Sequence, residues 1–177
     1  CAAYTNVDGA ETNEEICFAS NVIGVENLAL AAKNIDSAFV TISTDYVFDG
    51  SGSLPWRESD LANPLNVYGH SKLHGETAII ESGCNHLILR TSWVYGATGR
   101  NFAKTILQLA RERERLTIIN DQFGAPTGAE LLADITAQVI PKLLRHPELS
   151  GLYHIAARGE ATWYTYANFF LNFAREQ

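Results

Sequence analysis

The feature that most constrains the fold is a regular alternation of short apolar segments with longer segments of helical pattern. The short runs are typical of buried strands and cover residues 38–42 (AFVTI), 86–89 (HLIL), 116–119 (LTII) and 151–156. Apolar residues recur at helical spacing over residues 11–33, 63–82, 101–114, 129–144 and from 162 onward. The alternation predicts an α/β fold, a Rossmann-like, doubly wound parallel sheet with helices on both faces.

Two local signals set the expected bounds of the helix near the middle of the chain. Asn63 followed by Pro64 is typical of an N-cap and a first helical residue, and Gly83 is typical of a C-terminal stop. Polar residues directly follow two predicted strands, at 43–46 and at 90–93. Ligands of parallel sheets bind beyond the carboxyl ends of the strands, so these two clusters indicate where a site lies.

Composition excludes several classes of protein. Of 177 residues, 46% are hydrophobic and 19% are charged, which is incompatible with disorder. The formal net charge of −7 provides no basic surface for nucleic acid, and no apolar run reaches the roughly 18 residues of a membrane span. The three cysteines form no CxxC pair, which favours reduced thiols and a cytoplasmic location.

Tyr68 and Lys72 are the strongest candidates for chemistry. They are four residues apart, so on a helix they share one face. A lysine cation stabilises a phenolate and lowers its pKa, which suits a tyrosine that exchanges a proton with a carbonyl oxygen. An ordinary surface helix also produces this spacing, but Ser43 and Thr44 add hydroxyls at the end of the preceding strand.

Three segments, Ser-Thr-Asp-Tyr-Val-Phe-Asp-Gly (43–50), YGxSKxxGE (68–76) and Arg-Thr-Ser-Trp-Val-Tyr-Gly (90–96), resemble the extended short-chain dehydrogenase/reductases. Three more segments narrow the resemblance to the dTDP-4-dehydrorhamnose reductases: residues 1–8 (CAAYTNVD), 120–127 (NDQFGAPT) and 151–154 (GLYH). The motifs follow the order and spacing of that family and cover essentially the whole chain.

The resemblance implies a role for each matching residue. Tyr68 is implied as the proton donor to the 4-keto oxygen, Lys72 as the residue that lowers its pKa and holds the nicotinamide ribose, and Thr44 as their hydroxyl partner. The residues implied to contact the deoxysugar nucleotide are Thr44, Asp45 and Trp93. Those implied to line the cofactor are Ala3, Tyr4 and Thr5, with Asn21 supporting the lysine. Helix packing is the alternative for Asn21, and core packing for Trp93.

The activity implied by the resemblance is reduction of dTDP-4-dehydro-L-rhamnose to dTDP-L-rhamnose with a hydride from NADPH or NADH. No side chain supplies a hydride, so a cofactor is required. One alternative is a nucleotide-sugar epimerase or dehydratase of the same family, although dehydratases usually need an acidic pair where Asp45-Tyr46 follows Thr44. Another is a non-catalytic, reductase-like regulatory subunit of methionine adenosyltransferase.

The sequence departs from the family by lacking the glycine-rich loop that binds the cofactor pyrophosphate. The chain also opens with Cys1 and contains no methionine, so we expect a C-terminal fragment with a truncated sheet. Residues 1–119 are expected to be the remaining catalytic and dinucleotide-binding part. Residues 120–177 are expected to be mainly a small substrate-binding lobe, with the chain crossing between the two. We expect the isolated chain to bind NADP(H) very weakly.

Other polar groups carry weaker signals. His70 and His74 have the spacing of a helical metal pair, but they are offset by about 200° from the Tyr68 face, so we assign no metal ligand. Glu130 is expected to be a solvated acid in the first turn of a helix. The resemblance allows magnesium dependence and a homodimer, with Glu130 at a subunit contact.

Overall fold

The computed structural model describes residues 3–176, and its internal contacts divide the chain into two compact units. The first unit comprises Cys1–Thr91 and Ala137–Ile155, and the second comprises Ser92–Thr136 and Ala156–Gln177. The chain crosses between the units three times, after Thr91, within helix α6 (Ala129–Arg145) and after Ile155. From the sequence, residues 1–119 are expected to be the catalytic and dinucleotide-binding part, and residues 120–177 mainly the substrate-binding lobe. These two functions remain a prediction.

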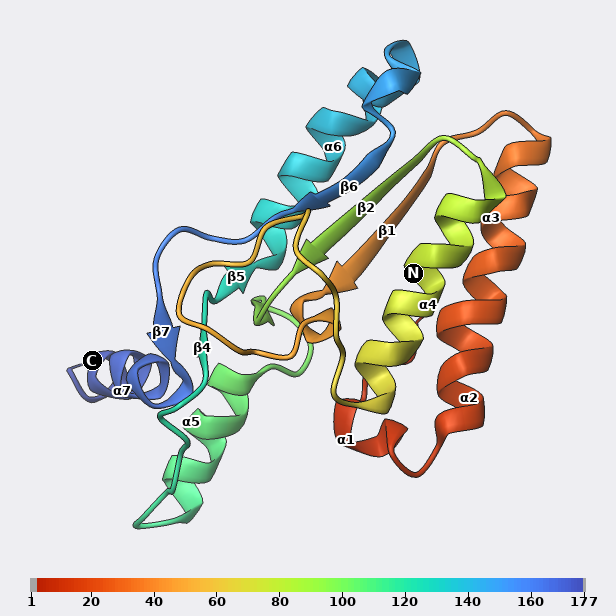
Figure 1. Ribbon diagram of the computed structural model, residues 1–177. Coiled ribbons are helices and arrows are strands. Elements are labelled where there is room, and N and C mark those ends of the chain that lie inside the picture. The colour runs from red at the N-terminus through yellow and green to blue at the C-terminus, as the bar shows by residue number, and fades with distance from the viewer. Residues whose placement is uncertain (1–2, 177) are drawn as a thin grey trace. The chain divides into compact units, whose positions relative to one another are not determined.

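The first unit is built on a parallel sheet in the order β1-β2-β6. Its strands are β1 (Phe39–Thr44), β2 (His86–Thr91) and β6 (Gly151–His154) (Figure 1). Ser43 pairs with Arg90, and Arg90 pairs with His154. The register therefore brings the polar carboxyl ends of β1 and β2 together, as the sequence predicts, and places the end of β6 beside them.

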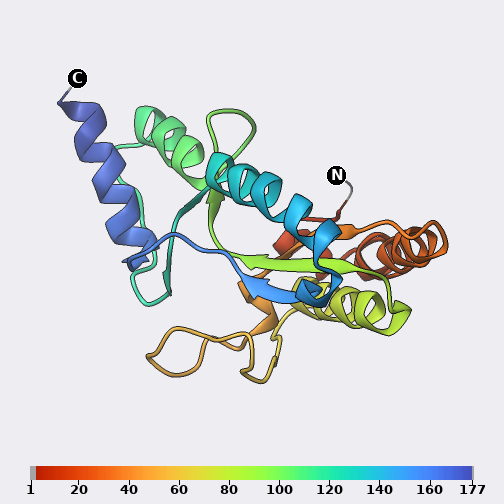
Figure 2. The same cartoon turned by 90° about the horizontal axis from the view of Figure 1, so that it is seen from above.

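Helices cover both faces of this sheet. Helix α4 (Val67–Ser82) and the second half of α6, residues 137–145, lie on opposite faces (Figure 1 and Figure 2). The expected α/β fold with a parallel sheet is therefore confirmed. Beside α4 runs one continuous helical segment made of α2 (Glu14–Phe18), a π turn η1 (Ala19–Ile23) and α3 (Gly24–Asn34). Three shorter helices complete the unit: α1 (Val7–Ala10), η2 (Asp45–Val47) and η3 (Pro147–Leu149).

The core of the first unit lies where α3 and α4 pack against the sheet. Ala29, Ile79, Cys84 and Ile88 are its buried members. Burial of such side chains supplies most of the free energy that holds helices on a sheet, about 1.5–3 kcal/mol for each large aliphatic residue. The segment Glu14–Asn34 is long and apolar enough to cross a membrane by length and composition alone, a test that core helices of soluble proteins also pass.

Helix α4 begins later than the sequence predicts. The expected N-cap at Asn63 is wrong, because Asn66 is the cap and its side chain accepts a 2.7 Å hydrogen bond from the Gly69 amide. Asn63 instead donates to the Asp49 carboxylate. The expected stop at Gly83 is confirmed, since this residue has φ 65° in the left-handed region that glycine adopts without strain.

The second unit contains two small sheets and two complete helices, α5 (Phe102–Glu112) and α7 (Trp163–Arg175). The strands β3 (Val94–Tyr95) and β5 (Thr127–Gly128) pair in parallel, and β4 (Phe123–Gly124) pairs antiparallel with β7 (Ala161–Thr162). The predicted strand at 116–119 is wrong. Those residues have strand composition, but no described strand pairs with them, and β4 forms later in the same loop.

Candidate active site

The carboxyl end of β1 forms one wall of the candidate site. Thr44 is buried, and its hydroxyl caps the short helix η2 by accepting from the Tyr46 amide at 3.2 Å. The same hydroxyl donates to the Asp45 carboxylate, also at 3.2 Å. Burial raises the pKa of Asp45 to about 6, although the bond from Thr44 acts in the opposite direction. The strand end therefore presents a hydroxyl and a carboxyl that titrates near neutral pH.

Helix α4 forms the facing wall. Tyr68 and Lys72 lie on its inward face, and the exposed His70 and His74 lie outside, as the helical spacing predicts. The Tyr68 ring packs edge-on against Tyr46, with ring centroids 5.8 Å apart. Gly69 is needed at this contact, because an added Cβ would collide with the Tyr46 carbonyl oxygen. Close approach of α4 to η2 brings Tyr68 and Thr44 together.

The pKa of Tyr68 differs from the value that the sequence suggests. Burial raises this pKa to about 12, and the hydrogen bond with Thr44 only partly opposes the rise. Lys72 was expected to lower the pKa, but its ammonium donates a 2.8 Å hydrogen bond to the Ile42 carbonyl on β1. Tyr68 therefore stays protonated near neutral pH.

Lys72 is itself buried, at 8% exposure. Burial lowers its pKa, and the negative charge of Glu76 is the main influence that raises the value again. A lysine ammonium has three N–H donors. With one donor bonded to Ile42, two remain for other acceptors, which fits a residue that holds ribose hydroxyls.

Asn21 connects the predicted cofactor segment to α4. It is 1% exposed and lies within the π turn, a feature often found at functional sites. Its side chain accepts from the Tyr4 amide at 2.9 Å and donates to the Tyr4 carbonyl and to Ser71 at 3.0 Å each. Asn21 thus fixes the backbone at Tyr4, between Ala3 and Thr5, rather than bonding to Lys72.

One buried ion pair was not singled out as a functional group from the sequence. Glu76 and Arg90 are 3% and 6% exposed, and the Arg90 Nη2 lies 2.6 Å from Glu76 Oε2. Glu76 follows Tyr68 and Lys72 at the same four-residue spacing. That spacing was a usable signal, because a charge on a buried helix face requires a partner.

Trp93 belongs to the second unit, whereas Thr44, Asp45, Tyr68 and Lys72 belong to the first. Its ring stacks on Trp163, with centroids 3.6 Å apart and planes 13° apart. Its backbone has φ 47°, in the left-handed region that bulky residues rarely adopt. Trp93 therefore has a packing role in its unit, and its contact with substrate remains a prediction.

A metal site in a protein usually needs several acidic, histidine or cysteine side chains close together. No group of three or more such residues that could hold a metal ion occurs within residues 3–176. Glu130 is exposed at the start of α6, as the sequence predicts.

Comparisons with known proteins show what this chain is similar to. A family model described as the RmlD substrate binding domain matches residues 1–177. The dTDP-4-dehydrorhamnose reductase of Escherichia coli (strain K12) is 54% identical over 175 residues, which are 99% of this chain and 58% of that protein. The enzyme of the same name from Salmonella typhimurium is 53% identical over the same shares. The chain thus spans less than two thirds of the length of these curated relatives.

Solved structures show the same relationship. A dTDP-4-dehydrorhamnose reductase from Clostridium acetobutylicum has a TM-score of 0.92 and 36% identity, over 99% of this chain and 60% of that one. The Bacillus anthracis enzyme of this name, solved in complex with NADP, has a TM-score of 0.88 and 38% identity over the same shares. The full-length match to the family model decides the assignment: the chain belongs to the RmlD substrate-binding domain family.

Proposed function

We propose that the protein containing this chain reduces the 4-keto group of dTDP-4-dehydro-L-rhamnose to give dTDP-L-rhamnose. The observation that carries the proposal is the placement of Thr44, Tyr68 and Lys72 in one site beyond the carboxyl end of β1. Relatives at 54% and 53% identity bear the name of this reductase, which supports the same substrate class. In this proposal the product is a precursor of cell-surface sugars.

Tyr68 acts as the proton donor in the proposed reaction. Reduction of a ketone places negative charge on its oxygen, and the resulting alkoxide is more basic than a phenolate. The pKa of Tyr68, raised by burial to about 12, keeps the phenol protonated until that charge develops. Thr44 supports the phenol through its hydroxyl. Asp45 and Trp93 are proposed as contacts to the deoxysugar nucleotide.

A nicotinamide cofactor, NADPH or NADH, supplies the hydride when it is bound. The residues proposed to hold it are Lys72, through the two donors not used by Ile42, and Ala3, Tyr4 and Thr5, whose backbone Asn21 fixes at Tyr4. Neighbouring structures solved with NADP support this class of cofactor. The proposal contains no metal ion.

The proposed setting is a cytoplasmic enzyme that takes a dTDP-sugar and engages neither nucleic acid nor a membrane, with a homodimer as its assembly. The proposal also includes the separate catalytic and substrate-binding parts that the sequence predicts. The sheet and α4 in the first unit provide the catalytic groups, and the second unit provides much of the substrate-binding lobe.

The direct test is turnover by the full-length protein. Loss of NADPH absorbance on addition of dTDP-4-dehydro-L-rhamnose is expected, and Tyr68→Phe should reduce kcat by at least about 10²-fold. Tyr164→Phe is the matched control, because Tyr164 is 47% exposed and should lose nothing. A full-length protein that binds cofactor but does not turn over would contradict the proposal and favour the regulatory-subunit alternative.

A further inference from the structure

The inward face of α4 carries a buried carboxylate, Glu76, that the proposed reaction does not use. Glu76 Oε1 accepts hydrogen bonds from Ser43 Oγ at 2.5 Å and from Arg90 Nε at 2.9 Å, and Glu76 Oε2 accepts from Arg90 Nη2 at 2.6 Å. Ser43 immediately precedes Thr44 and pairs with Arg90 in the sheet. One carboxylate therefore joins α4 to the ends of both β1 and β2.

Arg90 depends on the Glu76 carboxylate for its side-chain hydrogen bonds. Its Nη1 is buried without a hydrogen-bond partner in the described part of the chain, and Glu76 is the carboxylate that its other nitrogens reach. The Arg90 guanidinium lies 5.1 Å from the centre of the Phe48 ring, which stacks in turn on Trp56. Removal of the Glu76 charge would leave the buried Arg90 cation without its ion-pair partner.

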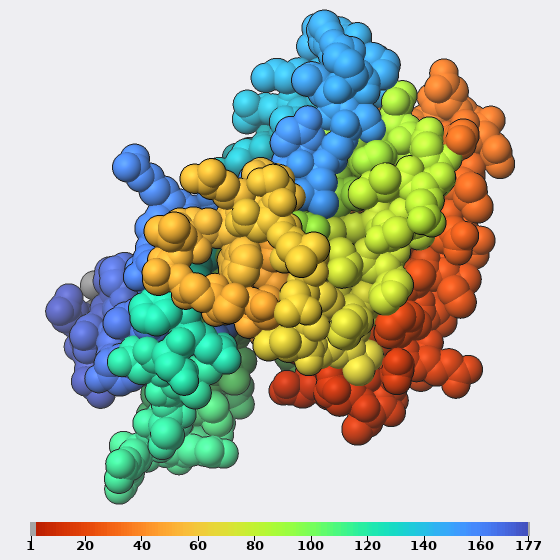
Figure 3. All heavy atoms as spheres, viewed as in Figure 1, coloured from red at the N-terminus to blue at the C-terminus, as the bar shows by residue number. Residues whose placement is uncertain are grey.

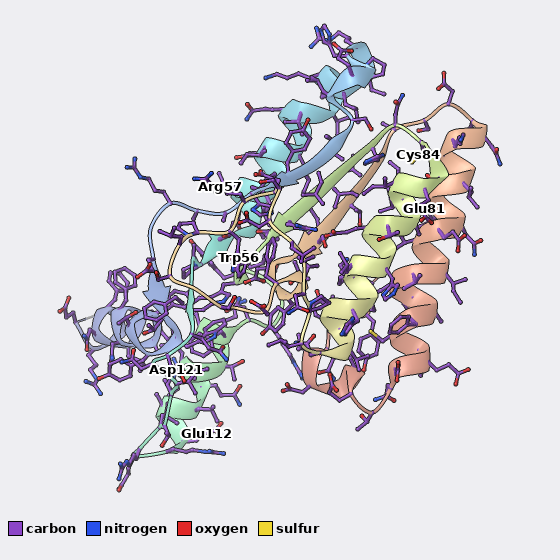
Figure 4. All side chains as sticks on the ribbon, in the orientation of Figure 1. Trp56, Arg57, Glu81, Cys84, Glu112 and Asp121 are labelled. Atoms are coloured by element: carbon purple, nitrogen blue, oxygen red, sulfur yellow. The ribbon has the colours of Figure 1, made fainter. Side chains whose placement is uncertain are left out.

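The loop that carries Trp56 encloses this network. The residues between η2 and α4 lie in front of the carboxyl ends of the strands in the space-filling view (Figure 3), and Trp56 is labelled in Figure 4. Glu58 fixes the loop to β6 by accepting a 2.8 Å hydrogen bond from the His154 amide. Charges in such an enclosed place interact more strongly than charges in water.

Glu76 is also one helical turn from Lys72, on the same face of α4. Both side chains line one small cavity, together with Ser43, Gly75 and Asn21. A purely structural reading is insufficient, because a buried ion pair contributes little net stability compared with apolar residues of the same shape. The charged group with a predicted catalytic role that shares this cavity with Glu76 is Lys72.

We propose that Glu76 is a positioning residue whose carboxylate, held by Ser43 and Arg90, keeps the buried Lys72 side chain in its charged form. This inference rests on the proposed function, in which Lys72 holds the cofactor as an ammonium. Glu76 opposes the fall in the pKa of Lys72 that burial causes. Arg90 belongs to the same arrangement, because its hydrogen bonds fix the Glu76 carboxylate.

Other titratable groups on elements packed against α4 also bear on Lys72. Cys17 on α2 acts in the same direction as Glu76 but less strongly. Lys33 on α3 bonds to the Ser82 carbonyl in the last turn of α4, well away along the helix. The remaining titratable side chains on these elements are Asp8, Glu14, Glu15, Glu26, Asp45, Tyr46 and His86. Glu76 is thus the dominant favourable charge.

Two neutralising variants of the full-length protein separate a charge effect from a packing effect. Glu76→Gln keeps the shape but leaves Arg90 unpaired, so the pKa of Lys72 should fall. Arg90→Gln leaves the Glu76 charge unpaired, so the pKa should stay the same or rise. If Glu76 and Arg90 only pack the interior, the two variants should not change the pKa of Lys72 in opposite directions. Glu81→Gln, at an exposed position on the same helix (Figure 4), is the matched control.

The readouts are a ¹³C NMR titration of lysine-labelled protein, which follows Lys72 without turnover, and the pH profile of kcat/KM. The expected result is a lower pKa and an alkaline limb at lower pH for Glu76→Gln alone. Equal shifts in both variants, or none in either, would overturn the inference. If Glu76→Gln fails to fold, Arg90→Gln decides alone, because a downward shift contradicts the proposal. Absence of turnover in the wild type refutes the proposed function but leaves the NMR test intact.

Discussion

The ammonium of Lys72 on α4 donates a 2.8 Å hydrogen bond to the backbone carbonyl of Ile42 on β1. This bond ties the helix that carries Tyr68 to the strand that ends in Thr44. It also fixes the direction of the Lys72 side chain before any ligand is bound. The catalytic candidates therefore have a defined spacing that depends on a backbone acceptor rather than on a second side chain.

Lys72→Met should lower kcat/KM of the full-length protein by about 10²-fold or more and raise KM for the nicotinamide cofactor, because it removes both the charge and the donors. Lys72→Arg keeps the charge and should retain part of the activity. Steady-state kinetics with NADPH checks both expectations. Lys142→Met, at an exposed position on α6, is the control. A Lys72→Met variant with unchanged KM for the cofactor would contradict the predicted ribose contact.

Asn21→Ala should lower the free energy of unfolding by about 1–3 kcal/mol, because it leaves the part-buried backbone N–H and C=O of Tyr4 without their partner. Urea denaturation of the full-length protein measures the change. Asn27→Ala is the matched control, since Asn27 is exposed on the continuation of the same helical segment. Equal stability of the two variants would show that Asn21 only fills space.

Regular patterns in the sequence were sufficient to predict the helix and the strands that carry the candidate site residues. The helical spacing of Tyr68 and Lys72 put both on one inward face, and β-branched runs marked the strands that end at the polar clusters. The N-cap was placed wrongly because Asn63 and Asn66 are the same residue type, and only the fold decides which one lies at the first turn. The run 116–119 has strand composition, but pairing requires a neighbour that composition cannot reveal.

The electrostatics of the site could not be predicted from spacing. The pKa of Tyr68 follows from burial beside Tyr46 and Thr44, and the sequence does not display burial. The partner of Lys72 is a backbone oxygen 30 residues away, and any residue type supplies such an oxygen. Trp93 likewise meets Trp163 only after the chain has folded back through β5 and β7. These contacts are properties of tertiary structure.

Gly75→Ala should destabilise the protein by about 1–3 kcal/mol, because the added methyl group would collide with the backbone carbonyl oxygen of Asn21. Neither backbone can yield without separating α4 from the π turn. Gly24→Ala is the matched comparison, since its nearest neighbour, the Ala19 carbonyl oxygen, is 3.4 Å away and alanine favours helix. Urea denaturation should show opposite signs for the two variants. A stabilised Gly75→Ala variant would refute this close approach.

Asp45→Asn should stabilise the protein at pH 7.5 and weaken substrate binding. The pKa of Asp45 is about 6 in the folded state, above the ordinary value of 3.8, so folding favours the protonated carboxyl. That contribution is fully present below pH 3.8 and is lost as pH rises through about 6. The amide has no charge to bury and can still accept the bond from Thr44. The variant should therefore gain up to about 3 kcal/mol at pH 7.5 and almost nothing near pH 4.

Urea denaturation at both pH values, with exposed Asp121→Asn as the control, checks this dependence. A gain of the same size at pH 4 and pH 7.5 would mean that the effect does not arise from ionisation of Asp45. If Asp45→Asn is less stable than the wild type at pH 7.5, the Asp45 carboxylate is in better contact with water or hydrogen-bond donors than its burial indicates. If the variant is more stable but has a higher KM for the dTDP-sugar, the buried charge at Asp45 is maintained for binding at the expense of stability.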